Sequence, residues 1–122
     1  MIAYSTLGTN DMDRSIAFYD AVFGALGAMR EVTTATWTRY GRAGERAKVC
    51  LTPPFDRQRA TFGNGMMLAF EAKDHAAVDA FHAAALAQGG ADEGLPGIRE
   101  ETHYVTYVRD PDGNKLCAFA PK

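Results

Sequence analysis

Two segments of the chain, residues 15–27 and 78–90, carry apolar side chains at three- and four-residue steps. This spacing predicts two amphipathic helices, each with one face suited to a protein core. The apolar positions are Ile16, Tyr19, Val22 and Phe23 in the first segment and Val78, Phe81, Ala85 and Leu86 in the second.

The ends of both predicted helices are marked by short polar and flexible residues. Asp11 and Asp74 precede the two segments and are suited to act as N-caps. Glycines follow each segment and are expected to stop the helix, as glycine does just past a helix end. These glycines are Gly24 and Gly27 in the first segment and Gly89 and Gly90 in the second.

The two halves of the chain repeat one another. Ala17-Phe18 aligns with Ala80-Phe81 at an offset of 63 residues. Strand-like runs precede each helix and three more follow it, so that each half reads β-α-β-β-β. The runs are 2–9, 30–34, 36–42 and 47–52 in the first half and 66–72, 92–101, 104–109 and 115–120 in the second.

The repeat predicts a single domain, residues 1–122, made of two modules. Module one covers 1–54, a linker with proline and glycine at its borders covers 55–64, and module two covers 65–122. Because about 60 residues bury little core alone, the modules are expected to share one. We therefore predict an α+β fold of two βαβββ modules, with a curved sheet that forms a cleft and helices on the outside. The cleft is the expected site.

Composition and charge limit the classes of partner that the chain is expected to bind. The chain is 47% hydrophobic and 23% charged, with a net charge of −2, so it carries no basic footprint for nucleic acid or an anionic membrane. No apolar run reaches bilayer-spanning length, and the N-terminus lacks the pattern of a signal peptide. We expect a cytoplasmic protein in which Cys50 and Cys117 are reduced thiols.

Three stretches carry a resemblance to a known family: NDMDRSIAFYDAVFGALG with the strand before it, the MLAF strand with its helix, and YVTYVRDPDGNKLCAF. Together they resemble the vicinal-oxygen-chelate superfamily, which includes glyoxalase I, extradiol dioxygenases, fosfomycin-resistance transferases and bleomycin-binding proteins. The resemblance covers nearly the whole chain. It implies paired βαβββ modules, a cleft in each sheet and a homodimer.

The resemblance also implies where a metal would sit. Enzymes of this superfamily typically hold one divalent ion with His and Glu side chains, and the four ligand positions fall here on Tyr4, Cys50, Met67 and Cys117. Hard divalent ions prefer imidazole and carboxylate ligands, and a phenol is neutral at pH 7. We therefore expect no metal of the usual kind and no cofactor. The three sulfur-bearing side chains leave open a site for Cu(I) or zinc, or else simple apolar filling.

The strand at 104–109 carries further candidates. Strand alternation places His103, Val105, Tyr107 and Arg109 on one face. By resemblance, Tyr107 matches a tyrosine that helps to bind substrate in fosfomycin-resistance enzymes, and the alternative is a core aromatic. His103 is a weak candidate for a general base or the partner of a reactive thiol, since its pKa lies near neutrality, and the alternative is a surface histidine.

A middle strand of the first half leaves one question open. Trp37 and Arg39 share a face of that strand. If they point inward, they supply a flat apolar wall and a cation for an anionic or aromatic ligand. If they point outward, Trp37 packs under the first helix.

These observations favour a glyoxalase-like protein that binds a small, largely apolar molecule without the usual metal. The expected lining is Tyr4, Thr6, Cys50, Met67, Val105, Tyr107 and Cys117. One alternative is a lyase or transferase that works without the usual ligands and takes its acid or base from His103, Glu71 or Glu101. Another is an accessory protein with a vestigial cleft.

Overall fold

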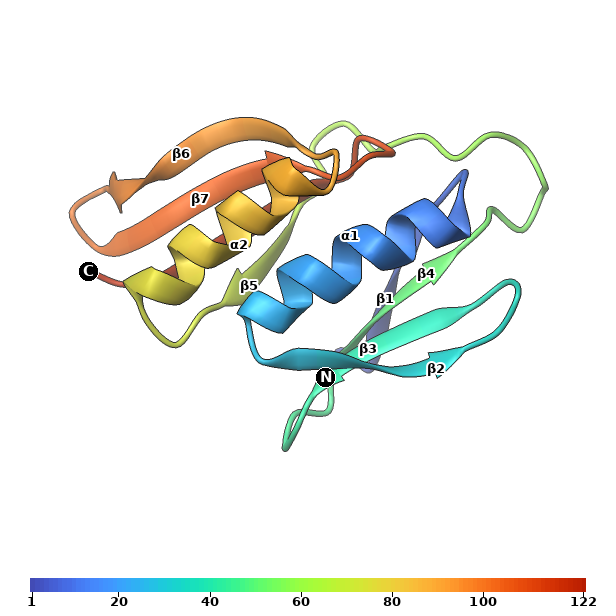
Figure 1. The fold of residues 1–122 in the computed structure, drawn as a ribbon, viewed down its shortest axis with the longest axis horizontal. Helices are drawn as coiled ribbons and strands as arrows, with labels where there is room; N and C mark the ends of the chain where they lie inside the picture. Colours follow the sequence, from blue (N-terminus) through green and yellow to red (C-terminus); the bar gives the residue numbers. More distant parts are fainter.

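A computed structural model describes all residues, 1–122, as two helices and eight strands (Figure 1). In chain order they are β1 (Tyr4–Gly8), α1 (Met12–Ala25), β2 (Ala28–Thr33), β3 (Thr38–Arg42), β4 (Lys48–Thr52), β5 (Leu68–Glu71), α2 (His75–Ala87), β6 (Ala91–Arg99), β7 (His103–Arg109) and β8 (Lys115–Pro121).

The strands form two four-stranded sheets with the same topology. Their orders are β1-β4-β3-β2 and β5-β8-β7-β6, and only β1–β4 and β5–β8 are parallel pairs. Each half of the chain is therefore a βαβββ unit, which confirms the predicted α+β fold of two repeated modules. The two sheets are not hydrogen-bonded to one another, so the curved sheet is divided into two parts.

Local sequence signals explain where the helices begin and end. The Asp11 carboxylate accepts a hydrogen bond from the backbone N–H of Arg14, and the Asp74 carboxylate accepts one from Ala77. Both predicted caps are thus confirmed, and both helices begin three residues before the apolar segments. Gly27 and Gly89 adopt left-handed φ angles of 76° and 86° just past the helix ends.

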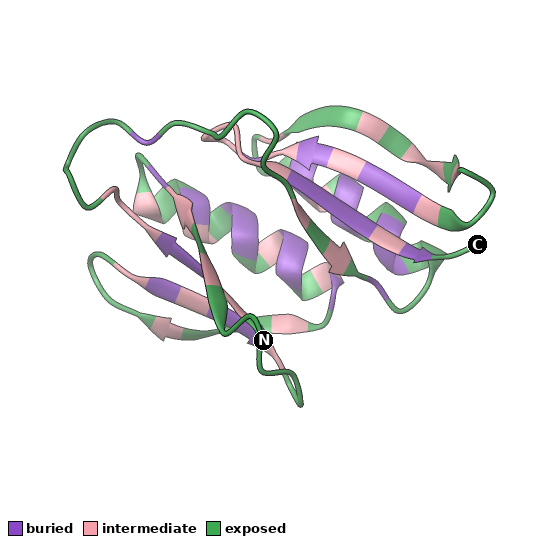
Figure 2. Cartoon of the chain, turned by 180° about the vertical axis from the view of Figure 1, so that it is seen from behind, coloured by how far each residue is buried: buried purple, intermediate pink, exposed green.

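The core lies between the helices and one face of each sheet. The two helices pack side by side against each other, and Figure 2 shows their buried faces turned toward the strands. Most of the predicted apolar face is confirmed, but Leu86 is wrong, because it is 43% exposed and Ala85 contacts the core instead. The largest fully buried side chains are Tyr19, Tyr40, Phe18, Phe81, Leu51 and Leu116.

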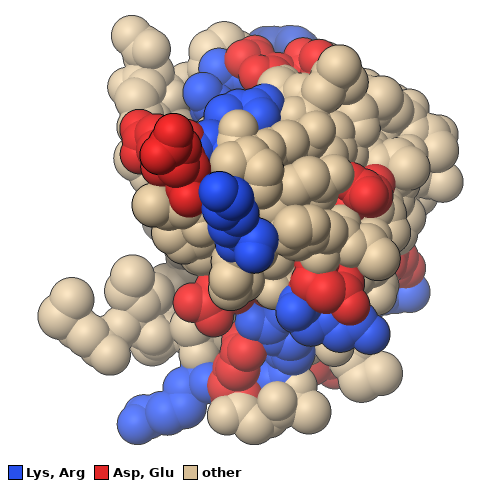
Figure 3. Space-filling model, turned by 90° about the vertical axis from the view of Figure 1, so that its left-hand side faces the viewer, with Lys and Arg blue, Asp and Glu red and all other residues tan.

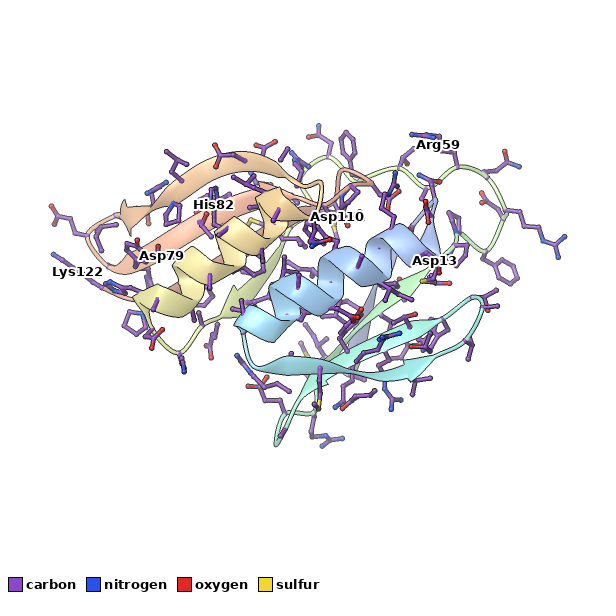
Figure 4. All side chains as sticks on the ribbon, viewed as in Figure 1. Asp13, Arg59, Asp79, His82, Asp110 and Lys122 are labelled. Atoms are coloured by element: carbon purple, nitrogen blue, oxygen red, sulfur yellow. The ribbon has the colours of Figure 1, made fainter.

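The turn between β7 and β8 ties the second module to the first. The Tyr19 hydroxyl donates a 2.6 Å hydrogen bond to the Asp110 carboxylate, and Arg14 forms a 2.8 Å ion pair with Asp112. Asn114 donates to the backbone carbonyl of Gly8 at 3.2 Å. Burial raises the pKa of Asp110 although its hydrogen bonds act in the opposite direction. Figure 4 shows Asp110 where the two helices meet.

The linker is held against module one. Ala60 is buried, its N–H donates a 2.7 Å hydrogen bond to the Asn10 side chain, and its carbonyl accepts one of 3.1 Å in return. This reciprocal pair fixes the middle of the segment that joins the two modules.

Candidate functional site

Each sheet has one face covered by a helix and one open face, which Figure 2 shows from behind. On β4, Val49 and Leu51 pack toward the core, so Lys48 and Cys50 lie on the open side. The same alternation along the other strands assigns their residues to the open or the covered side. The "module 1 face" consists of Tyr4, Thr6, Glu31, Trp37, Arg39, Lys48 and Cys50, and the "module 2 face" of Met67, Ala69, Arg99, His103, Val105, Tyr107, Arg109, Lys115, Cys117 and Phe119.

The two faces are related by the internal repeat. Lys48-Val49-Cys50 on β4 and Lys115-Leu116-Cys117 on β8 occupy the same place in their sheets, each next to the edge strand. Cys50 pairs with Thr6, and Cys117 pairs with Ala69. The predicted site residues are therefore divided between two sheets: three of the seven lie on the module 1 face and four on the module 2 face.

The structure answers the question about Trp37 and Arg39. Between them, Thr38 is fully buried and its hydroxyl donates to the sulfur of Met12 on α1, so its neighbours point to the open side. The Trp37 ring meets the Tyr4 ring edge to face, with centroids 5.9 Å apart.

A charged group lies beside this aromatic pair. Glu31 accepts hydrogen bonds from Lys48 Nζ at 3.0 Å and from Arg39 Nε at 3.2 Å. The two cations hold the pKa of Glu31 below its usual range, Lys48 more strongly than Arg39. The group therefore carries two positive charges and one negative charge.

The module 2 face combines aromatic and aliphatic side chains with basic ones. Tyr107 is half-buried with Lys115 Nζ 5.4 Å from its ring centroid, and it is not part of the core cluster. His103 is exposed, touches the edge of Phe119 at 5.4 Å and bonds the hydroxyl of Thr102. The face thus offers rings and three basic side chains, Lys115, Arg109 and Arg99, and its histidine contacts no thiol.

Both cysteines are buried free thiols in separate sheets. Burial raises the pKa of Cys50, and it raises that of Cys117 to about 11 although Lys115 acts against it. The Cys117 thiol is therefore protonated at neutral pH and is a poor nucleophile.

The donor set at the four family ligand positions does not fit a hard divalent ion. A phenol, a thioether and two protonated thiols replace the imidazoles and carboxylates that such ions prefer. No group of three or more His, Cys, Asp or Glu side chains is arranged to hold a metal. The chain therefore lacks the usual ligands of its relatives.

A pocket of about 430 Å³ opens between the two sheets, and Lys48, Ala69 and Phe119 of the open faces are among its lining residues. Phe23 of α1 and Leu26 just past the helix also line it, and Arg42, in the same lining, donates to the carbonyls of Leu26 and Glu71 at 3.1 and 2.7 Å. None of the seven predicted residues lines this pocket. Met67 lines a smaller one of about 30 Å³ beside Phe62 and Met66.

The sequence contained no direct signal for this pocket. It exists because the edge strands β1 and β5 are not paired with each other, and unpaired edges leave no mark in the local pattern. The only available hint was that Ile2, Leu68 and Phe70 lie in apolar runs at these edges.

The comparisons with known proteins agree with this architecture. The family model "Glyoxalase/Bleomycin resistance protein/Dioxygenase superfamily" matches residues 1–118. The chain belongs to this superfamily. A glyoxalase/bleomycin resistance protein from Albidiferax ferrireducens T118 is 40% identical, with a TM-score of 0.92, over 100% of this chain and 99% of the other. No curated protein matches the chain.

Two solved structures of lower sequence identity share the fold. Lactoylglutathione lyase from Agrobacterium tumefaciens is 22% identical with a TM-score of 0.70, and the match covers 98% of this chain and 92% of the lyase. TnmS3, an antibiotic binding protein from Streptomyces sp. CB03234, is 20% identical with a TM-score of 0.69, over 100% and 96% of the two chains.

Two global features bear on partners. Neither helix is long and apolar enough to cross a membrane. On the side of the molecule in Figure 3, basic and acidic side chains are interspersed, and no large patch of one sign forms there.

Proposed function

We propose that this superfamily member binds a small, largely apolar molecule against its open faces without a divalent metal. The observation that carries the proposal is the chemistry at Tyr4, Cys50, Met67 and Cys117, where the family's ligand positions hold no imidazole and no carboxylate. Apolar surface with a few polar groups at fixed places is the ordinary composition of a small-molecule site.

An antibiotic-binding neighbour supports binding as the activity. TnmS3 has the same fold, and its name describes it as binding an antibiotic. Fold alone does not fix function, so the support comes from this likeness together with the missing ligands.

No observation favours the enzyme reading. His103, Glu71 and Glu101 lie on β7, on β5 and in the β6–β7 turn, and no contact joins them. A general acid and base must both reach one substrate atom, so scattered groups of this kind make a poor catalytic set.

The proposal includes a homodimer in the cytoplasm, with no nucleic-acid or membrane partner. It also keeps the division into module one (1–54), linker (55–64) and module two (65–122). Sedimentation velocity on the untagged protein measures the oligomeric state directly, and a species of one chain at micromolar concentration would remove the dimer from the proposal.

The direct test is an NMR screen of uniformly ¹⁵N-labelled, EDTA-treated protein against small aromatic alcohols, amides and acids. We expect at least one compound to shift amide signals of β1, β4, β7 or β8. The Tyr107→Phe variant lacks the hydroxyl group, so it should bind more weakly any compound that hydrogen-bonds to that group. Tyr104 lies on the covered face of the same strand, so Tyr104→Phe should leave the affinity for these compounds unchanged. Binding that appears only after a divalent metal is added would overturn the proposal.

A further inference from the structure

The module 1 face presents two aromatic rings to solvent. Tyr4 is 58% exposed and Trp37 is half-buried, and their edge-to-face contact keeps the two ring planes at 80°. Two rings at nearly a right angle form a corner, in which a flat molecule stacks on one ring while its edge meets the other. The corner therefore fits a planar aromatic group.

The free hydrogen-bonding groups around this corner are mainly donors. Arg39 uses only Nε on Glu31, so neither of its two terminal NH₂ groups has a partner within the chain. The Trp37 indole N–H is likewise free. Both oxygens of Glu31, the one carboxylate of this face, already accept hydrogen bonds from Arg39 and Lys48.

The charge of the module 1 face also favours a ligand that accepts hydrogen bonds. Two cations surround one carboxylate, and the Arg39 side chain is 42% exposed, so its planar end can reach a ligand. A guanidinium with two free NH₂ groups matches the paired oxygens of a carboxylate.

We infer that the module 1 face recognises a planar aromatic anion, with the ring in the Trp37–Tyr4 corner and a carboxylate on the Arg39 guanidinium. This inference rests on the proposed function and makes it more specific. It names the class of ligand, and it names the module 1 face as the surface that binds the charged group of the ligand. On the module 2 face, Arg109 and Arg99 each already use one terminal NH₂ group on a backbone carbonyl, so neither offers the two free NH₂ groups that Arg39 has.

The test uses 2-naphthoate and its neutral analogue 2-naphthamide. Trp37 is the one tryptophan of the chain, so its indole N–H gives a single signal in a ¹⁵N–¹H spectrum that needs no assignment. We expect 2-naphthoate to shift this signal and to bind about tenfold more tightly than 2-naphthamide, as charge-assisted hydrogen bonds allow.

Two matched variants separate a local contact from general charge. Arg39→Gln should lower the affinity for 2-naphthoate about tenfold and leave the affinity for 2-naphthamide unchanged. Arg30→Gln removes the same charge from the covered side of the same module, where Arg30 pairs with Asp20 of α1, and should leave both compounds unchanged. Equal losses in the two variants would overturn the inference.

A third variant should change the affinity for 2-naphthoate in the opposite direction. Glu31→Gln removes the carboxylate that competes for Arg39 and Lys48, so it should tighten 2-naphthoate binding. Because Glu31→Gln is expected to gain affinity, it still tests the inference if the Arg39→Gln protein folds poorly. Equal affinity for acid and amide, or binding that shifts only module 2 signals, overturns the inference and leaves the proposed function standing. Failure of every compound in the screen overturns both.

Discussion

At the scale of single residues, the surroundings of the Cys117 thiol determine its reactivity. Its neighbour on β7 is Tyr107, its neighbour on β5 is Ala69, and only 4% of it is exposed. Desolvation of the charged form dominates over the nearby Lys115 ammonium, so the pKa of the thiol rises to about 11.

We therefore predict slow alkylation of Cys117 with a steep pH dependence. In a Cys50→Ala variant, the rate with iodoacetamide should rise about tenfold per pH unit between pH 8 and 10, because the thiolate is the reactive form and remains a minor fraction up to about pH 10 when the pKa is about 11. The same protein in guanidinium chloride is the control, and its rate should level off near an ordinary thiol pKa of about 8.5. A plateau below pH 9 in the folded protein would contradict this environment.

Residue facing was only partly predictable from sequence. Alternation along β7 correctly placed Val105 and Tyr107 on one face, because the intervening Thr106 and Val108 are fully buried. The same rule paired Trp37 with Arg39 but did not say which way they point. That choice depends on Thr38 meeting Met12 on a helix 26 residues away, which no local pattern reveals.

At the scale of elements, the β6–β7 hairpin has an unusual turn. Glu100 and Glu101 adopt left-handed φ angles of 52° and 60°, and the N–H of Thr102 bonds the carbonyl of Arg99 at 3.2 Å. Two consecutive positive φ angles define a type I′ turn, in which Asn-Gly is the favoured pair. The two glutamates therefore hold strained backbone at this hairpin tip.

Replacement of Glu101 by glycine should stabilise the protein. The left-handed conformation costs a residue with a side chain about 1–2 kcal/mol, and the greater freedom of unfolded glycine offsets about 0.5–1 kcal/mol of that relief. We expect the free energy of unfolding in urea to rise by about 0.5–1 kcal/mol. Ala43→Gly, in the β3–β4 turn at a position without positive φ, is the control and should not stabilise. A destabilised Glu101→Gly protein would show that the turn is not strained.

Element boundaries followed closely from capping and turn residues. Asp11 and Asp74 fix the helix starts, and the turn at Asp110–Asn114 separates β7 from β8 as expected. The apolar period alone begins three residues inside each helix, because the first turn of each helix is largely polar or small.

At the scale of the whole molecule, a buried carboxylate takes part in the contact between the two modules. Asp110 accepts hydrogen bonds from Tyr19 of α1 and from the backbone and side chain of Asn114. Desolvation by burial and the adjacent carboxylate also raise the pKa of Tyr19 well above its usual value. The phenol therefore stays protonated and remains a donor.

Asp110→Asn should destabilise the chain by about 2–3 kcal/mol, because an amide NH₂ would face donors where the carboxylate accepted them. Asp79→Asn is the matched control: Asp79 also accepts a 2.6 Å hydrogen bond from a tyrosine, Tyr104, but at an exposed site. Its cost should stay within about 0.5 kcal/mol. Similar urea midpoints for the two variants would show that Asp110 is not central to the junction.

The internal repeat predicted the paired modules, but it did not predict how they are placed. A repeat fixes the topology of each half, whereas the separation of β1 from β5 depends on helix packing and on the Asp110 junction. The pocket between the sheets follows from that separation, which is why the predicted lining residues lie elsewhere.

The central claim is that this member of the superfamily works without the divalent ion of its relatives. Elemental mass spectrometry of untagged protein, dialysed in turn against nickel, zinc, manganese and Cu(I) and then against metal-free buffer, tests it most directly. The account predicts well under one ion per chain in every case. One ion per chain that is lost in Cys117→Ala would contradict it and would place a metal centre between the strands where the family carries one.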